Sequence, residues 1–282
     1  MKKTNSIKKL KLIANSLRQH VIKMTVEAGS GHPGGALGMA DVFAVLYFNY
    51  ANLKPRNPSW EKRDRIVLSN GHICAVQYAA MAELGFFPLS ELLTFRKINS
   101  RLQGHPHNKS LPGIENSSGS LGQGLSVACG MALARKLDNK KYKIFCIMSD
   151  GEHDEGQTWE AILFAAKNNL KIVSLIDRNG IQLSGFTEII MPLEPLAKKY
   201  ESFGWKVIEI DGNDIKQILS ALKESEKINK PVAIICNTIL GKGVSFMENN
   251  YEWHGKAPDK EQAERALKEL QELRKTIESE ND

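Results

Sequence analysis

Apolar and polar positions along the chain follow two different periods, and segments of each kind alternate. Apolar residues recur at helical spacing over about 8–28, 155–168 and 214–225, and through Tyr50 after a Gly-rich stretch, which predicts helices there. Five short apolar runs predict buried β-strands, at residues 65–69, 143–148, 171–177, 204–210 and 231–239. Strands that alternate with helices form βαβ units, so we predict an α/β fold, a parallel β-sheet with helices on both faces.

Both ends of the chain are predicted to be helical. The basic N-terminal segment has no continuous apolar run, which indicates an amphipathic helix and not a signal peptide. Ala263, Leu270 and Ile277 form one stripe of a second amphipathic helix over about 259–280, which packs on its own domain or docks on a partner. No repeat, low-complexity tract or flexible linker divides the sequence, so we expect one domain over residues 1–282.

Composition narrows the classes of function. Hydrophobic residues make up 42% and charged residues 25% of the chain, as in ordinary globular proteins. The net charge of +6 suits anionic ligands, but no basic block is interleaved with aromatics, so we expect no nucleic acid. No apolar stretch is long enough to predict a membrane span. Four cysteines without paired spacing predict buried free thiols and a reducing, cytoplasmic location: Cys74, Cys129, Cys146 and Cys236.

Polar residues follow two predicted strands that are neighbours in sequence. Asp150 comes directly after the strand at 143–148, and Gly151 lets the backbone turn past it. Asn179 follows the strand at 171–177, and ligands of parallel sheets bind beyond the carboxyl ends of strands. Carboxylate, amide and carbonyl oxygens suit Mg²⁺ or Ca²⁺, so this edge is a candidate metal site. The alternative is that the two loop ends only cap adjacent helices.

The run "SDGEHDEG" places four carboxylates within six positions. Like charges this close repel one another unless a cation, a proton or solvent intervenes. We expect Glu152, His153 and Asp154 to be solvated and to have no role in a site.

Asp150-Gly151, followed after 26 residues by Arg178-Asn179, resembles the signature of thiamine-diphosphate enzymes. Ser149 and Arg178 depart from that signature, whereas the two metal-binding positions are intact. Further motifs occur in the order found in transketolases: "SGHPGGALGMA", "VLSNGH", "GHPHNKSLPGIENSSGSLGQGLSVACGMALA" and "TILGKGVSF" with "EWHG". Over essentially its whole length the chain resembles the diphosphate-binding half of transketolase.

The resemblance implies a role for individual residues. Metal ligands would be Asp150, Asn179 and the backbone of Ile181, while Glu155 and Glu160 would lie at a subunit interface. Three further histidines match no motif and are expected to be structural: His20, His107 and His153. The matching catalytic histidines are His32, His72, His105 and His254. The matching cofactor-binding residues are His72, Gly119, Leu121, Asp150, Gly151, Glu155, Asp177, Asn179 and His254.

The resemblance also implies a reaction and a partner. It predicts thiamine diphosphate with Mg²⁺, or Ca²⁺ in its place, and transfer of a two-carbon ketol unit from a ketose phosphate to an aldose phosphate. The pyrimidine-binding and C-terminal domains of transketolase have no counterpart here, so we expect a separate C-terminal subunit, an α2β2 assembly and no activity of the chain alone. Alternatives are a ketol transferase for a different sugar, a 2-oxo-acid dehydrogenase α-type chain, and a non-catalytic metal- or phosphate-binding protein.

Overall fold

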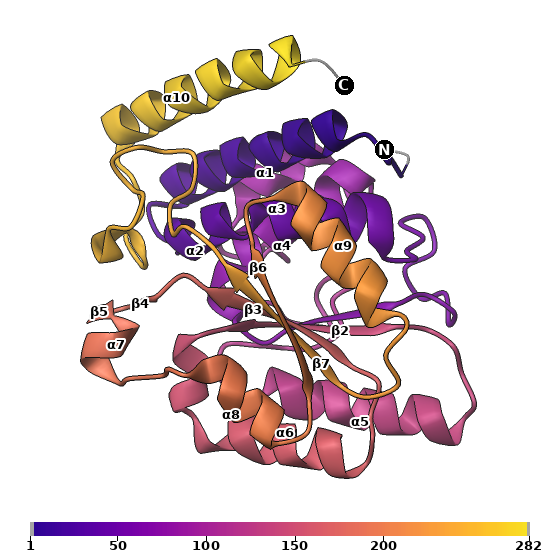
Figure 1. Ribbon diagram of the computed structural model, residues 1–282. Helices are drawn as coiled ribbons and strands as arrows, with labels where there is room; N and C mark the ends of the chain where they lie inside the picture. The colour runs from indigo at the N-terminus through magenta and orange to yellow at the C-terminus, as the bar shows by residue number, and fades with distance from the viewer. Residues whose placement is uncertain (1–2, 281–282) are drawn as a thin grey trace.

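The computed structural model describes residues 3–280, and a five-stranded parallel sheet forms its centre (Figure 1). The strand order is β1-β2-β3-β7-β6, so all neighbours in the sheet run in the same direction. The strands are β1 (Arg65–Leu68), β2 (Ile144–Ser149), β3 (Val173–Arg178), β6 (Lys206–Asp211) and β7 (Val232–Asn237). The predicted α/β fold with a parallel sheet is therefore confirmed.

Successive side chains of each strand point to opposite faces of the sheet, so each strand contributes to two hydrophobic clusters. In β2, Phe145 and Ile147 join the larger hydrophobic cluster, whereas Cys146 and Met148 join the smaller one. Since both faces are buried, the strands read as continuous apolar runs and not as alternating ones. Helices cover both faces (Figure 1).

The larger cluster lies between the sheet and a two-deep stack of helices, at the top of Figure 1. α1 packs against α3, α4 and α10, and α9 packs against α3. Asn15 donates to the carbonyl of Leu270 at 3.0 Å, which joins the first long helix to the last. These helices are α1 (Ile7–Ala28), α3 (Ala40–Val45), α4 (Cys74–Leu84), α9 (Ile215–Ser225) and α10 (Lys260–Ser279).

The smaller cluster is covered by a single layer, at the bottom of Figure 1. Tyr200 and Trp205 are buried here, and the indole of Trp205 donates to the carbonyl of Ile162 at 3.0 Å. The layer consists of α5 (Gly124–Leu137), α6 (Gly156–Lys167) and α8 (Leu196–Ser202).

The helical pattern predicted to run through Tyr50 is interrupted. The structure has a short helix α2 (Pro33–Gly38), then α3, and then the π-helical turn η1 (Leu46–Tyr50). Glycines in "PGGALG" lower helix propensity, and Met39 leaves helical geometry with ψ near 0°. The break lets α2 turn toward the carboxyl edge of the sheet.

The remaining elements are short. After β3 the chain forms a small hairpin, β4 (Ile181–Gln182) and β5 (Gly185–Phe186), and then α7 (Thr187–Ile190), at the left of Figure 1. No sequence pattern had indicated it. The 3₁₀ turns are η2 (Gly71–Ile73), η3 (Leu89–Thr94), η4 (Gly151–Asp154) and η5 (Tyr251–Trp253).

Two predictions from composition can be checked directly. All four cysteines are free and buried, as predicted. Among residues 3–280, no helix combines the length and hydropathy that crossing a membrane requires.

Candidate functional site

The loops that follow β2 and β3 meet at the carboxyl edge of the sheet. Ser149 is in register with Asp177, and the Asp150 amide donates to the carbonyl of Asp177 at 3.1 Å. The carboxylate of Asp150 accepts from the amide of Gly180 at 2.7 Å, so it reaches the loop that carries Asn179. The structure therefore brings Asp150 and Asn179 together, as the parallel-strand argument predicts.

Asp150 is a buried carboxylate, with 1% of its surface exposed. Its Oδ1 accepts from the amide of Gly151 at 2.7 Å, and its Oδ2 accepts from Arg178 Nη1 at 3.0 Å. Burial raises the pKa of Asp150 to about 6, although the charge of Arg178 acts in the opposite direction. The carboxylate thus stands in a place where a further positive charge would stabilise its ionised form.

Asp177 lies fully inside the same edge and is held by two donors. Thr238 Oγ1 donates to Oδ1, and Asn179 Nδ2 donates to Oδ2 at 3.0 Å. Burial, with the nearby charge of Asp150, raises the pKa of Asp177 to about 7. The bond to Asp177 orients the Asn179 amide, so that its oxygen faces the other way and accepts from the amide of Ile181 at 2.9 Å.

These oxygens fit a hard divalent cation by their chemistry. One carboxylate, one amide oxygen and one backbone carbonyl would come from Asp150, Asn179 and Ile181, and Mg²⁺ is commonly bound by few protein ligands plus phosphate oxygens and water. The guanidinium of Arg178 pairs with the same carboxylate, so a metal would share Asp150 with Arg178. Within residues 3–280 no three His, Cys, Asp or Glu side chains gather as a metal cluster, so a metal would depend on this mixed oxygen set.

Four histidines from four separate loops form one cluster at this edge. Ring centroids lie 5.4 Å apart for His32 and His72, and 6.0 Å apart for His32 and His254. His72 and His254 stack at 5.2 Å, and His105 lies 6.2 Å from His32. These histidines, each of which adjoins a glycine in the sequence, are scattered over more than 220 positions and assemble around His32.

Burial and mutual repulsion keep these imidazoles neutral. The pKa of His32 is lowered to about 4, first by burial and then by the charges of His254 and Arg96. The pKa of His72 is lowered well below its ordinary value, and those of His105 and His254 are also lowered, each chiefly by burial. A neutral imidazole has one donor and one acceptor nitrogen, so near pH 7 each ring can either give or take a hydrogen bond.

Polar atoms without a partner surround the cluster. Both amide atoms of Asn70, the Ser118 hydroxyl and Nδ1 of His254 are buried and accept or donate no hydrogen bond within residues 3–280. Buried polar groups of folded proteins are rarely left unpaired, so these atoms point to a polar ligand. They fit a heterocyclic cofactor that carries nitrogen and phosphate groups.

The loop before α5 approaches these atoms closely. A Cβ at Gly71 would lie 2.4 Å from Ser118 Oγ, so only glycine permits this contact. Gly119 has φ of 150°, a conformation that favours glycine, and Leu121 follows it in the same loop. The backbone of the "SSGSLGQG" segment therefore borders the histidine cluster, where the resemblance places the cofactor rings.

The prediction that Glu152 and His153 are solvated is wrong. Glu152 is 0% exposed and His153 is 2% exposed, whereas Asp154 is exposed as predicted. His153 Nδ1 lies 2.9 Å from the carbonyl of Ser149, and its Nε2 lies 2.8 Å from the hydroxyl of Tyr200. The 3₁₀ turn η4 folds the acidic run back under the end of β2 and buries these two side chains. The spacing of acidic residues in the sequence does not reveal this turn.

Glu152 is buried without an ion-pair partner. Burial raises its pKa to about 8, against the opposing effect of the Ser69 hydroxyl and the Ser149 backbone. Within residues 3–280 neither of its oxygens has a donor at hydrogen-bonding geometry. The repulsion expected within the acidic run is therefore relieved in part by a proton, because Glu152 is mostly neutral at pH 7.

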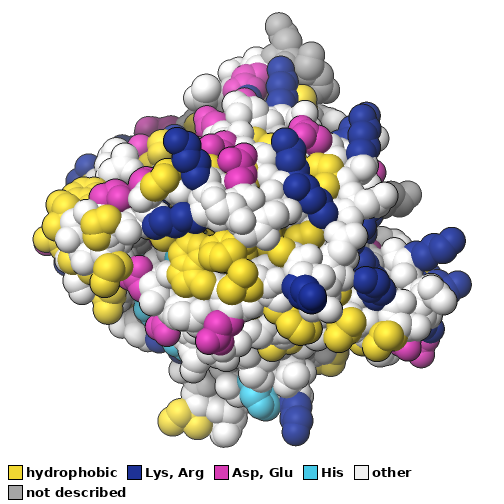
Figure 2. Space-filling view, turned by 60° about the horizontal axis from the view of Figure 1, so that its bottom comes forward, with side chains coloured by type: hydrophobic (Ala, Val, Ile, Leu, Met, Phe, Trp, Pro, Cys, Tyr) yellow, Lys and Arg dark blue, Asp and Glu magenta, His cyan; other side chains and the backbone are white. Residues whose placement is uncertain are grey.

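Glu155 and Glu160 are both exposed, on the N-cap and the outer side of α6. Figure 2 brings this side of the molecule forward and shows hydrophobic side chains gathered among lysines and arginines. On α5 and α6 the exposed apolar residues are Val127, Leu137, Leu163 and Phe164. The position of the two glutamates leaves them free to meet another chain.

Sequence reasoning missed two polar residues of the site. Arg96, far from any recognised motif, has Nη2 3.5 Å from His32 Nδ1 and 3.4 Å from the carbonyl of Gly104. Asn70 lies inside the quoted motif "VLSNGH", which was the available signal for it. No local pattern indicated Arg96, since its position depends on the loop after η3.

Comparisons with known proteins agree with this geometry. The profile of the transketolase thiamine diphosphate binding domain matches residues 9–274. A 6-deoxy-6-sulfo-D-fructose transketolase subunit from Clostridium sp. (strain MSTE9) is 41% identical and covers 92% of this chain and 94% of that protein. A subunit of the apulose-4-phosphate transketolase from Phocaeicola vulgatus is 38% identical and covers 98% of both.

Longer transketolases match over part of their length. The crystal structure of transketolase from Campylobacter jejuni superimposes with a TM-score of 0.88 at 34% identity, over 96% of this chain and 43% of that one. The match of the profile to nearly the whole chain, the shared fold and the assembled site lead to one conclusion: this chain belongs to the transketolase family and forms its thiamine diphosphate binding domain.

Proposed function

We propose that the chain is the N-terminal subunit of a split transketolase, which transfers a two-carbon ketol unit between phosphorylated sugars with thiamine diphosphate and Mg²⁺. The observation that carries the proposal is the carboxyl edge of the sheet, which holds both a cluster of four imidazoles with lowered pKa values and the carboxylate of Asp150 bound to the loop of Asn179. The relatives that this chain matches over almost their whole length are named as transketolase subunits. A partner subunit would then supply the rest of the active site.

The residues of this chain would bind, orient and move protons. Asp150, Asn179 and the Ile181 carbonyl would hold the metal that anchors the diphosphate. Thiamine diphosphate, when bound, supplies the carbon nucleophile and takes up the electron pair of the breaking carbon–carbon bond. His32 and His254, neutral at pH 7, would bind the substrate hydroxyls and carbonyl and pass protons as that bond breaks and forms again.

The reaction class does not by itself identify the sugar substrates. We propose phosphorylated ketose and aldose substrates of the general transketolase reaction. The named relatives act on a sulfo-sugar and on apulose 4-phosphate, which favours one of these specialised ketoses as the second candidate. The groups that would choose the anionic end of the sugar belong to the partner subunit, so this chain recognises the ketol end common to all of them.

Exposed apolar surfaces support an α2β2 assembly. A groove between α5 and α6 of about 360 Å³ is bordered by Glu160 and Phe164, and Phe164 is 43% exposed. A second copy of the chain would pack on it, which brings Glu155 and Glu160 to a subunit interface. The hairpin and α7 expose a second apolar set, which the C-terminal subunit would cover: Leu183, Phe186, Ile189, Ile190 and Met191.

The decisive experiment reconstitutes the pair. The chain and a pyrimidine-domain partner encoded beside it would be purified separately and together, and ketol transfer measured with thiamine diphosphate, Mg²⁺ and a panel of ketose donors. We expect activity only for the mixture, and a mass in solution of two copies of each chain. The preferred donor in the panel then identifies the sugar.

Two outcomes would contradict the proposal. Ketol transfer by this chain alone would remove the need for a partner subunit. A reconstituted pair that binds thiamine diphosphate yet releases carbon dioxide from 2-oxo acids, and transfers no ketol unit, would favour the dehydrogenase-type alternative.

A further inference from the structure

We propose that the amino edge of the sheet holds a second binding site, for a small molecule that carries several adjacent phosphate groups. The site is a cavity of about 690 Å³ bordered by Ile144, Phe145 and Val173 at the start of β2 and β3. A volume of this size is typical of small-molecule sites. Because β2 lies between this cavity and Asp150, the two sites are separated by about 20 Å at roughly 3.3 Å per residue.

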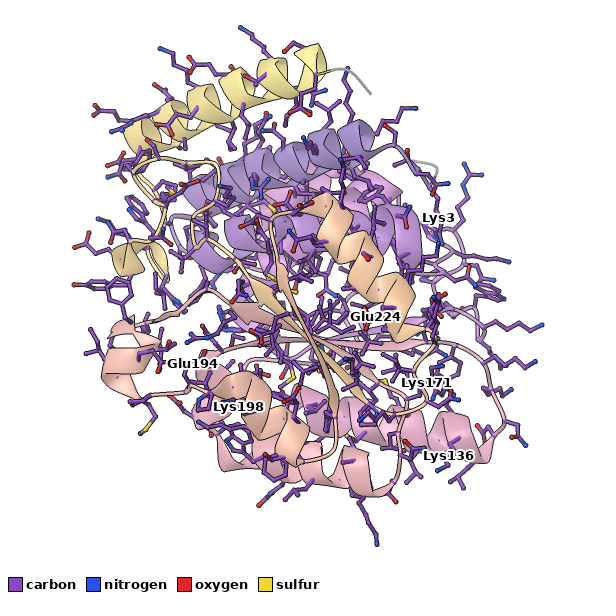
Figure 3. All side chains as sticks on the ribbon, in the orientation of Figure 1. Lys3, Lys136, Lys171, Glu194, Lys198 and Glu224 are labelled. Carbon is purple, nitrogen blue, oxygen red and sulfur yellow. The ribbon has the colours of Figure 1, made fainter. Side chains whose placement is uncertain are left out.

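The charge of the cavity is strongly one-sided. Glu226 is the one carboxylate among the residues that border it. Six cationic side chains from α5, the loop after α5 and the loop before β3 border the same space: Arg135, Lys136, Lys140, Lys141, Lys143 and Lys171. In Figure 3, Lys136 and Lys171 lie at the same right-hand end of the molecule, and Lys198 lies on the opposite side.

Most of these cations are held without being neutralised. Lys136 donates to the carbonyl of Asn168 at 2.9 Å, and Lys171 donates to the carbonyl of Glu226 at 3.0 Å. These carbonyls at helix ends orient the ammonium groups and attract them as dipole ends, but they bear no net charge. Arg135 likewise donates to a carbonyl, that of Tyr142, at 3.1 Å.

Carboxylates balance only two of the six. Lys143 pairs with Glu226 at 2.6 Å, and Lys140 lies 3.9 Å from Glu61. Within residues 3–280 the other four form no ion pair. Arg178 provides the contrast, since its single guanidinium meets three carboxylates at the opposite edge. Cations that converge on a cavity without matching acids favour an anionic ligand.

The arrangement indicates more than one phosphate group. The six cations come from separate segments around the cavity, and an ammonium binds phosphate as a point charge, so a single phosphate would engage only the few nearest. A second cavity of about 800 Å³ shares Lys140, Lys141 and Lys143 and adds Lys3 and Lys62, with Glu61 and Asp64 as the carboxylates at its border. A chain of phosphates fits this elongated basic surface, whereas a lone phosphate leaves most of it unused.

Calorimetry tests the proposal on the full chain, with tripolyphosphate and ATP as probes at about 0.15 M salt, where distant surface charges are largely screened. We expect saturable binding of one molecule per chain. Equal affinity for the two probes assigns recognition to the phosphate chain, and tighter binding of ATP adds the nucleoside. Absence of saturable binding for both probes overturns the proposal.

Matched variants locate the site. K136Q/K171Q removes two cavity cations, and we expect affinity at least about tenfold weaker. K198Q/K268Q removes two exposed lysines elsewhere and should leave affinity unchanged. If K136Q/K171Q lowers the unfolding midpoint, K141E serves instead, because Lys141 is exposed and makes no hydrogen bond among the described residues. Equal losses in the cavity and control variants would show nonspecific attraction and reject the site.

A last arm separates this site from the cofactor site. Binding of the probes should persist in D150N. Thiamine diphosphate itself carries adjacent phosphates, so excess thiamine diphosphate with Mg²⁺ can compete at either site, and the variants decide between them. Competition that is lost in D150N and kept in K136Q/K171Q would place the probes at the carboxyl edge and overturn the proposal, without affecting the proposed ketol transfer.

Discussion

Two buried aspartates stand at opposite ends of the same sheet. Asp64 precedes β1 at the amino edge and is 3% exposed, and Asp150 follows β2 at the carboxyl edge and is 1% exposed. Asp64 accepts from two backbone amides, those of Asn52 at 2.8 Å and Lys143 at 2.7 Å. Asp150 also accepts from two backbone amides but meets Arg178 as well.

The difference lies in what each carboxylate does for folding. The amides that donate to Asp64 belong to two different loops, so this carboxylate holds both loops at the start of the sheet. The pKa of Asp150 is raised to about 6, which means that the folded protein disfavours its charge relative to the unfolded chain. A charge that the fold tolerates at a cost is typical of a functional site, although ion-pair networks also perturb pKa values.

The largest expected effect follows from D150N in the reconstituted enzyme. Without this carboxylate the metal and the diphosphate would not be anchored, so we expect ketol transfer to fall at least about 10⁴-fold, the upper range of single acid–base groups. The free energy of unfolding should also fall, by up to about 1–3 kcal/mol, because the amide of Gly151 or Gly180 would face an NH₂ group instead of an acceptor. Removal of a charge that burial disfavours offsets part of this cost, and Arg178 keeps Glu188 and Glu194. Activity assays and urea unfolding check both parts; normal activity in D150N would remove Asp150 from the site.

A smaller loss is expected at the centre of the histidine cluster. H32N keeps a polar side chain but removes a proton carrier, and we expect kcat to fall about 10²–10⁴-fold with the partner present. The matched control is H20N, because His20 pairs with Glu83 at 3.0 Å in another part of the molecule. If both variants lose activity equally, the cluster has no special role.

Substitution of Asp64 should lower stability and leave activity unchanged. D64N leaves one backbone amide, of Asn52 or Lys143, facing an amide group instead of an acceptor, which costs about 1–3 kcal/mol of unfolding free energy. Activity per folded molecule should stay unchanged, since the site lies at the other edge. A D64N enzyme with normal stability and reduced kcat would abolish the contrast between the two aspartates.

The smallest effect concerns pH. The pKa of His32 is lowered to about 4 and that of His72 lies well below its ordinary value, so the unfolded chain binds more protons than the folded one below pH 6.5. Stability contributed by these rings is present above pH 6.5 and is lost as pH falls toward 4. The raised pKa values of Asp150, Asp177 and Glu152 act in the opposite direction between pH 7 and pH 5, so the test is a difference between two proteins. Measured by urea unfolding, the change in free energy of unfolding from pH 7 to pH 5 should be less unfavourable in H32N/H72N than in the unmodified chain. Equal changes in the two proteins would contradict the prediction.

The sheet was predictable because buried parallel strands leave an unmistakable apolar run. The run at 65–69 became β1, and the run at 171–177 became most of β3, within a few residues at each end. The interrupted helix before Tyr50 was not predictable, since the interruption depends on how α2 reaches the site. Periodicity reports which face is buried and says little about where a helix bends.

At the site, parallel neighbours were sufficient to place Asp150 near Asn179. Burial of Glu152 and His153 was not predictable, because acidic runs are usually solvated and only the turn η4 hides these two side chains. Arg96 reaches His32 through a loop whose path no local pattern indicates. The roles of the individual site residues stay predictions until the variants are measured.

The pairing of α1 with α10 has a consequence for synthesis of the protein. Asn15 donates to the carbonyl of Leu270, and Lys8 donates to the carbonyl of Glu280 at 2.7 Å, so the first long helix is covered by the last. A ribosome makes α1 well before α10, because residues 29–259 separate the two helices. The apolar side of α1 that faces α10 therefore stays uncovered while the intervening segments are translated, a period in which chaperones and neighbouring nascent chains have access to it.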